Sequence, residues 1–147
     1  GGFMKKYFIF ICLLSVFQFC SCSTFVKNKI PYGVQGDLST NDSNLYDFLG
    51  LNLCIKNNSE KTISKVTVVF YVFDENGEPP YGMQNHIVLT IGCQIKPNEI
   101  LEDCFSLDKY VYSLESMELT IDYLYVSKIE YDDGSEWCDP FGANVIF

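Results

Sequence analysis

A hydrophobic period of two residues recurs along most of this chain and constrains its fold more than any other feature. The period is clearest in LGLNLCIKN (49–57), where every second residue from Leu49 to Ile55 is apolar. Because side chains alternate between the two faces of a strand, this period predicts β-structure. The same alternation occurs in 66–73, 87–95, 101–107 and 117–129, the last with an expected bulge or bend between Tyr123 and Val126.

Turn-forming sequences separate these segments, including NNSEKT (57–62), DENGEPP (74–80), KPNE (96–99) and DDGS (132–135). No ten-residue stretch of the domain has a helical period, although 107–116 is compatible with a loop or a single helical turn. Six or seven short strands broken by turns predict an all-β fold, an immunoglobulin-like antiparallel β-sandwich over residues 46–147. In the strand over 66–73, Val69, Tyr71 and Phe73 face away from the expected core, which predicts a strand covered on both sides.

A hydrophobic segment precedes the domain. Lys5 and Lys6 are followed by a largely apolar run over 7–19, which is shorter than the roughly 17–25 residues of a membrane-spanning helix but typical of a signal peptide. We expect residues 1–21 to form this signal, with 1–3 extraneous to it. Cleavage before Cys22 leaves the small residues Ser21 and Cys20 next to the cut, so the segment resembles a bacterial lipoprotein signal. Phe19 stands where such signals usually have Leu.

This resemblance implies that Cys22 carries the lipid and that the membrane is a partner. Residues 22–45, rich in Ser, Thr, Asn and Gly, are then expected to form a flexible tether, with 25–30 adding at most a short strand. The implied location is the bacterial cell envelope, outside the cytoplasm. An ordinary secretory signal with incidental cysteines and a retained membrane anchor are the alternatives.

Four of the seven cysteines lie within the expected domain: Cys54, Cys93, Cys104 and Cys138. In an oxidising compartment they are candidates for two disulfides, with three connectivities open. If the 96–99 turn closes a symmetric hairpin, Ile95 pairs with Ile100. Cys93 and Cys104 then point to opposite faces, which disfavours a bond between them. Pairing of Cys54 with Cys104, or of either with Cys138, stays open.

Charge and composition exclude several classes of function. The chain has 10 basic and 19 acidic residues, a net charge of −9, and no arginine, so we expect no nucleic-acid partner. We expect no metal and no cofactor: DENGE (74–78) lacks the ligand spacing of a calcium loop and is better explained as a turn. His86 is the only histidine, and the sequence indicates no nucleophile or second carboxylate that would act with it. We therefore expect that the protein is not an enzyme.

The strand FYVFD (70–74) resembles the signature strand of the FxLYD-type immunoglobulin-like domains, which occur in bacterial exported proteins and lipoproteins. IKNNSEKTISKVTV (55–68) is similar to the strand and asparagine-rich turn that precede that signature, and KPNE occupies the place of the family's Pro-Gly-Glu turn. The similarity extends over about residues 48–107 and implies the sandwich fold, without implying an activity.

Aromatic residues are concentrated in the C-terminal half of the chain. We expect a protein or glycan partner to bind there, on Tyr110, Tyr112, Tyr125, Tyr131 and Trp137. The alternative is that these rings fill a second layer of core or cover a sheet edge. The sequence therefore predicts a non-enzymatic, lipid-anchored module for binding or structure. A soluble secreted carbohydrate-binding module or inhibitor is the alternative.

Overall fold

The computed structural model describes residues 29–40, 44–113 and 118–144. Within them the chain forms seven β-strands and one short 3-10 turn, which lies in the segment for which the sequence is compatible with a helical turn. In chain order these are β1 (Tyr32–Thr40), β2 (Leu49–Asn57), β3 (Ile63–Phe73), β4 (His86–Ile95), β5 (Ile100–Ser106), η2 (Asp108–Tyr110), β6 (Thr120–Tyr131) and β7 (Glu136–Cys138).

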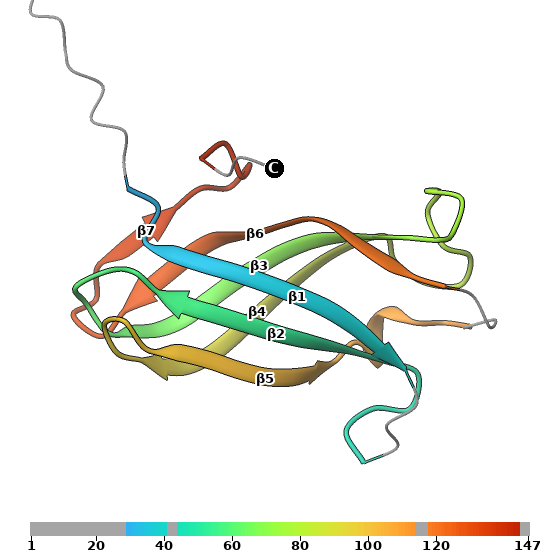
Figure 1. Ribbon diagram of the computed structural model, residues 1–147, viewed down its shortest axis with the longest axis horizontal. Helices are drawn as coiled ribbons and strands as arrows, with labels where there is room; N and C mark the ends of the chain where they lie inside the picture. The colour runs from blue at the N-terminus through green and yellow to red at the C-terminus, as the bar shows by residue number, and fades with distance from the viewer. Residues whose placement is uncertain (1–28, 41–43, 114–117, 145–147) are drawn as a thin grey trace, which may run out of the picture.

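The strands form two sheets that pack face to face (Figure 1). One sheet has three strands in the order β1-β2-β5, and the other has four in the order β4-β3-β6-β7. Every neighbouring pair is antiparallel. In immunoglobulin notation this order is A-B-E against C′-C-F-G, so the predicted antiparallel β-sandwich is confirmed.

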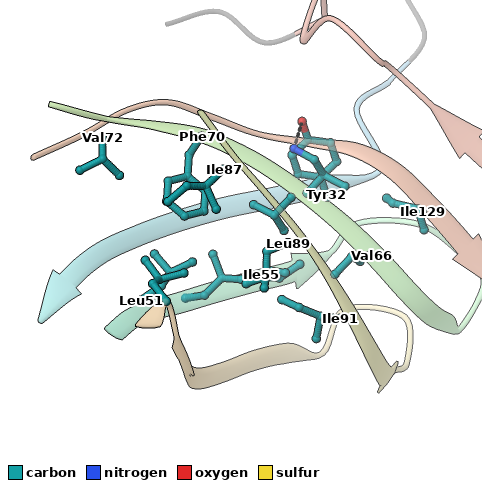
Figure 2. Close-up of a cluster of buried hydrophobic side chains, with 14 of the residues drawn as sticks. Tyr32, Leu51, Ile55, Val66, Phe70, Val72, Ile87, Leu89, Ile91 and Ile129 are labelled. Atoms are coloured by element: carbon teal, nitrogen blue, oxygen red, sulfur yellow. Dashed lines mark hydrogen bonds between the residues drawn. The ribbon is translucent and has the colours of Figure 1, made fainter. Parts of the chain in front are cut away.

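The core lies between the sheets and is built from the alternating residues that the sequence singles out. Leu49, Leu51, Leu53 and Ile55 of β2 are buried, and they face Val66, Val68, Phe70 and Val72 of β3, all fully buried. Figure 2 shows these side chains meeting those of β4 and β6 in one apolar layer. Burial of this layer is the main term that stabilises the fold.

The first strand corrects the expected domain boundary. Residues 32–40, assigned above to the tether, form β1 and pair with β2 from Tyr32↔Asn57 to Thr40↔Leu49. Tyr32 is buried, and its hydroxyl accepts a hydrogen bond from the backbone N–H of Val126 in the other sheet (3.1 Å, dashed in Figure 2). The domain therefore includes β1, and a tether can only precede it.

The symmetric hairpin considered above for the 96–99 turn does not form, because β4 and β5 belong to different sheets. The 96–99 turn instead carries the chain across the sandwich. It is held by the end of β2: the Asn98 N–H donates to the Asn57 carbonyl (2.9 Å), and the Asn57 N–H donates to the Glu99 carbonyl (3.0 Å). These two bonds satisfy backbone groups of the turn and attach it to β2.

A bulge divides β6, as the change of period near residue 124 predicts. The register with β3 passes from Val69↔Tyr125 to Tyr71↔Asp122, so one extra residue lies on β6. Tyr123 adopts a φ of 53°, a conformation that is rare for a bulky residue, and half of its surface is exposed. The bulge turns the Tyr123 ring away from the core.

Candidate functional site: an aromatic hollow on the four-stranded sheet

The most distinctive surface is a hollow of about 510 Å³ on the outer face of the four-stranded sheet. Strand alternation creates it: Phe70 and Val72 of β3 point into the core, so Tyr71 and Phe73 point outward. The bulge of β6 adds Tyr123, and the segment after β7 (Figure 1) adds Phe141. The complete lining is Tyr71, Phe73, Asn85, Tyr123, Tyr125 and Phe141, which we call the aromatic hollow.

Tyr71 is the centre of this cluster. Its ring stacks on His86 of β4, with centroids 4.8 Å apart and planes 24° from parallel. The Phe73 ring lies 6.5 Å away and is also nearly parallel to it. Tyr123 meets Tyr71 edge-on at 5.9 Å, with the planes at 82°. The hollow therefore presents ring faces in two nearly perpendicular directions, which makes a corner rather than a flat platform.

Tyr123 reaches this position at a conformational cost. An L-residue other than glycine at positive φ is unfavourable by about 1–2 kcal/mol, and such strain often marks functional positions. Asp122 offsets part of the cost, because its Oδ1 accepts a hydrogen bond from the Tyr123 N–H (2.8 Å). The bulge, the strain and the neighbouring carboxylate all serve to place one exposed tyrosine against Tyr71.

A tight C-terminal turn closes the other side of the hollow. Asp139 is buried, with 4% of its surface exposed, and its carboxylate accepts hydrogen bonds from the N–H groups of Ala143 and Asn144 (both 2.9 Å). Gly142 lies flat on the Tyr125 ring at a φ of 64°, and an added Cβ would come 3.1 Å from that ring. The turn thus covers Tyr125 and projects Phe141, which is 88% exposed.

The stability of this C-terminal turn should depend on pH. Burial alone would raise the pKa of Asp139, but hydrogen bonds from the Asn144 and Ala143 amides outweigh it and lower the pKa below the ordinary 3.8. A carboxyl group with a lowered pKa stabilises the folded state above its unfolded pKa, and this stabilisation disappears as the pH falls through the folded pKa. We expect the turn to open as the pH falls below the ordinary aspartate pKa and through the lowered pKa of Asp139, which hydrogen exchange at the Ala143 and Asn144 amides will report.

The matched variant is Asp139→Asn, which has nearly the same shape but no charge and only one acceptor oxygen. That oxygen can keep the bond from the Ala143 N–H as a weaker neutral bond, whereas the NH₂ group cannot accept from the Asn144 N–H. The protection factors of the two amides should therefore fall at least about fivefold to tenfold at pH 7. Protection in the variant should then no longer fall over the acid range in which the Asp139 carboxyl of the unmodified chain becomes protonated. Protection factors equal to those of the unmodified chain at pH 7 would show that the carboxylate does not hold the turn.

The structure does not bring the five predicted aromatic residues to one face. Tyr125 and Tyr131 are buried, and Trp137 is half-buried with its ring edge-on to Tyr32 at 5.5 Å. The Tyr110 hydroxyl donates to the Val88 carbonyl (2.7 Å), and Tyr112 alone is largely exposed, at 71%. Only Tyr125 belongs to the aromatic hollow, because the other four lie on β7, the end of β6 and the 107–113 segment.

The predicted disulfides among the domain cysteines are absent from the described part of the chain: Cys54, Cys93, Cys104 and Cys138 are not joined to one another. Cys54 pairs across β2–β5 with Glu102, and Cys104 with Asn52, so the two thiols are diagonal neighbours. Diagonal positions are about 7–8 Å apart, beyond the usual Cα separation of a disulfide. Cys93 and Cys138 lie on opposite edge strands of the other sheet.

The three-stranded sheet has a hollow of its own, of about 490 Å³, whose lining includes three carboxylates and no aromatic ring. It includes Asp37, Asn52, Glu102 and Asp103, side chains typical of a solvated sheet face. Within residues 29–40, 44–113 and 118–144, no three His, Cys, Asp or Glu side chains converge as a metal site would require. The same residues contain no helix with the length and apolar character to cross a bilayer.

Comparison with known proteins supports the fold. No family model matches the sequence, and no curated protein matches it. Among solved structures, a hypothetical protein from Peptoclostridium difficile 630 is similar, with a TM-score of 0.53 and 12% sequence identity. The match covers 76% of this chain and 88% of the other. At this identity the similarity concerns the fold alone, and the resemblance to FxLYD-type domains stays a prediction.

Proposed function

We propose that this protein is a non-enzymatic binding module of the bacterial cell envelope, held at a membrane by a lipid on Cys22, and that its ligand binds in the aromatic hollow. The observation that carries the proposal is the hollow itself. Five aromatic side chains from β3, β6 and the C-terminal turn converge on it, and one of them occupies a strained backbone conformation. Binding sites are typically apolar concavities with a few placed polar groups.

The surroundings of His86 support binding over catalysis. A general base must lie within hydrogen-bond distance of the group whose proton it takes. His86 instead stacks its ring on Tyr71 and so extends the aromatic surface of the hollow at the first residue of β4. The sandwich then acts as a rigid frame that holds the aromatic rings in place. The lipid anchor keeps the hollow close to the membrane surface, so the protein encounters ligands there.

Anchoring predicts the effect of substituting Cys22. Cys22→Ser removes the thiol that accepts the lipid, so we expect a protein found in the membrane fraction to become soluble or to keep its uncleaved signal. Cys20→Ser is the matched control, because it retains Cys22 and a small residue before the cut; it should stay in the membrane fraction. The intact mass of each form distinguishes these products. A lipid-modified mass for Cys22→Ser would contradict the assignment of the anchor.

Ligand binding in the hollow is tested separately by photocrosslinking in intact cells. A benzoylphenylalanine replaces Tyr71, inside the hollow, or Tyr112, an exposed tyrosine of the 107–113 segment outside it. We expect adducts of defined mass from position 71 that position 112 does not give. Identical adduct patterns from the two positions, or none from position 71, would contradict a binding role for the hollow.

A further inference from the structure

We propose that the aromatic hollow binds a ligand that carries an alkylated ammonium group, such as a quaternary ammonium head group. This inference rests on the proposed binding function and names the chemistry of its ligand. The occupant is an organic cation because the hollow combines ring faces in two orientations with nearby carboxylates. Its six lining residues include no Lys, Arg or His, although His86 stacks on Tyr71 beside them.

The ring geometry fits a cation. The negative π-faces of Tyr and Phe attract cations placed within about 6 Å of a ring centroid. Tyr71 and Phe73 provide nearly parallel rings, while Tyr123 stands at 82° to Tyr71, so a group seated in the corner lies near more than one ring. Phe141, which is 88% exposed, provides a further ring at the rim.

The charges around the hollow have the complementary sign. Asp122 is exposed, lies opposite Tyr71 in the β3–β6 register and precedes Tyr123 in sequence. Asp139 lies behind Tyr125: burial, then the neighbouring Tyr71 and Asp139, raise the pKa of the Tyr125 hydroxyl. The chain as a whole has a net charge of −9. A negative potential at the hollow favours a cation and disfavours an anion.

Hydrogen-bonding capacity argues for an alkylated cation over a sugar. Two donors of the lining are already used, since the Tyr125 hydroxyl donates to the Pro140 carbonyl (3.2 Å) and Asn85 Nδ2 donates to the Val72 carbonyl (2.6 Å). A sugar would bring many hydroxyl groups that need partners, and a primary ammonium would bring three N–H donors. A quaternary ammonium presents only C–H surface, which the ring faces can contact without any hydrogen bond.

The test compares two probes of the same shape. Choline and its uncharged isostere 3,3-dimethyl-1-butanol are titrated by calorimetry into the full chain, in a polyoxyethylene detergent that contains neither choline nor sugar. We expect choline to bind at least about tenfold more tightly than the isostere, the difference that a desolvated cation–π contact supplies. Cellobiose, as a neutral sugar, should give no measurable heat.

Variants locate the binding. Tyr71→Leu should weaken choline binding about tenfold or more, whereas Tyr71→Phe keeps the ring face and should bind nearly as the unmodified chain does. Tyr112→Leu removes an exposed tyrosine outside the hollow and should have no effect. Equal binding of the isostere, preferential binding of cellobiose, or choline binding that survives Tyr71→Leu would each overturn the proposal.

The two proposals can fail separately. Crosslinks specific to position 71 without choline binding would keep the hollow as a binding site and reject the cationic ligand. Choline binding that is lost in Tyr71→Leu, without any crosslink from position 71 in cells, would support the cation chemistry and reject the binding role in the envelope.

Discussion

Replacing Asn57 by Ala should destabilise the domain by about 3–4 kcal/mol. Asn57 is completely buried at the end of β2. Its Nδ2 donates to the carbonyls of Lys61 (2.7 Å) and Ile95 (2.9 Å), and its Oδ1 accepts from the N–H and hydroxyl of Ser59 (2.9 and 2.7 Å). Removing the amide takes a donor away from the buried Ile95 carbonyl and two acceptor bonds away from Ser59, whereas the Lys61 carbonyl keeps the Ser59 hydroxyl (3.1 Å). A buried carbonyl that loses a donor costs more than the hydrogen bond contributed.

The position of Asn57 explains why one side chain matters so much. It joins the 57–62 turn, which leads from β2 in one sheet to β3 in the other, to Ile95 at the end of β4. Its backbone groups meanwhile hold the 96–99 turn, where the chain crosses back. Two crossings of the sandwich therefore depend on one residue, and hydrophobic burial between the sheets depends on both crossings.

Urea denaturation, monitored by tyrosine and tryptophan fluorescence, measures how far Asn57→Ala lowers the free energy of unfolding. The matched control is Asn58→Ala: Asn58 is the next residue of the same turn and is exposed, so its substitution should change stability by no more than about 0.5 kcal/mol. Asn57→Asp keeps the acceptor for Ser59 but sets a carboxylate against two carbonyl oxygens, and should be worse than Ala. Similar midpoints for Asn57→Ala and Asn58→Ala would contradict the central role of Asn57.

The sequence predicts a strand of this fold only where one face of the strand is apolar and the other is more polar. β2, β3 and β4 are predicted because their inward positions are nearly all apolar, as in Leu49 to Ile55. β1 is missed because Gly36 occupies one of its inward positions. A Cβ there would lie 3.0 Å from the Leu124 side chain, so β1 approaches β6 closely at this glycine, which interrupts the hydrophobic period.

The candidate site is predicted only in part, because it depends on contacts between residues distant in sequence. The outward positions of Tyr71 and Phe73 indicate a strand covered on both sides; in the structure Val69 is buried, but Tyr71 and Phe73 are half-buried and line the hollow. The covering residues, however, come from the β6 bulge and from a turn about 70 residues later, where Gly142 packs on Tyr125. Alternation alone assigns Tyr123 to the core, whereas its positive φ turns it outward.

The hairpin considered for residues 95–100 does not form, because that reasoning treats the 96–99 turn as local. Short turns between strands can also lead from one sheet to the other. The bonds that decide the outcome come from Asn57, which is about 40 residues away in the chain. The NNSEKT turn is recognisable in the sequence, but the role of Asn57 as a bridge to the next turn requires the three-dimensional arrangement.

The second large effect is expected from Gly82→Ala, which should lower the free energy of unfolding by about 3 kcal/mol. Gly82 has a φ of 82°, and a Cβ at this position would lie 1.9 Å from the carbonyl oxygen of Ser113. The Gly82 carbonyl also accepts hydrogen bonds from the N–H groups of Tyr112 and Ser113 (2.6 and 2.9 Å). Neither backbone can move away without losing these bonds and the adjoining Met83↔Val111 bridge.

Gly77→Ala separates the two contributions to this effect. Gly77 has nearly the same backbone conformation, with a φ of 77°, but no atom lies within 4 Å of an added Cβ. Its substitution therefore measures the strain of a left-handed L-residue alone, about 1 kcal/mol, and the difference between the two variants measures the close approach. Equal losses in a urea titration would mean that the 107–113 segment moves aside at little cost.

The Gly82 variant should also affect the aromatic hollow. Gly82 and Met83 tie the segment before β4 to the 107–113 segment, and the same segment leads directly into Asn85, whose backbone carbonyl accepts from the Val72 N–H (2.9 Å). Loosening this segment frees Asn85 at one wall of the hollow, and His86, stacked on Tyr71, follows it. We therefore expect Gly82→Ala, unlike Gly77→Ala, to weaken choline binding as well as folding.

The affinity for choline is measured under conditions where the Gly82→Ala variant is still folded. An affinity equal to that of the unmodified chain would show that β3, β6 and the C-terminal turn alone hold the hollow in place.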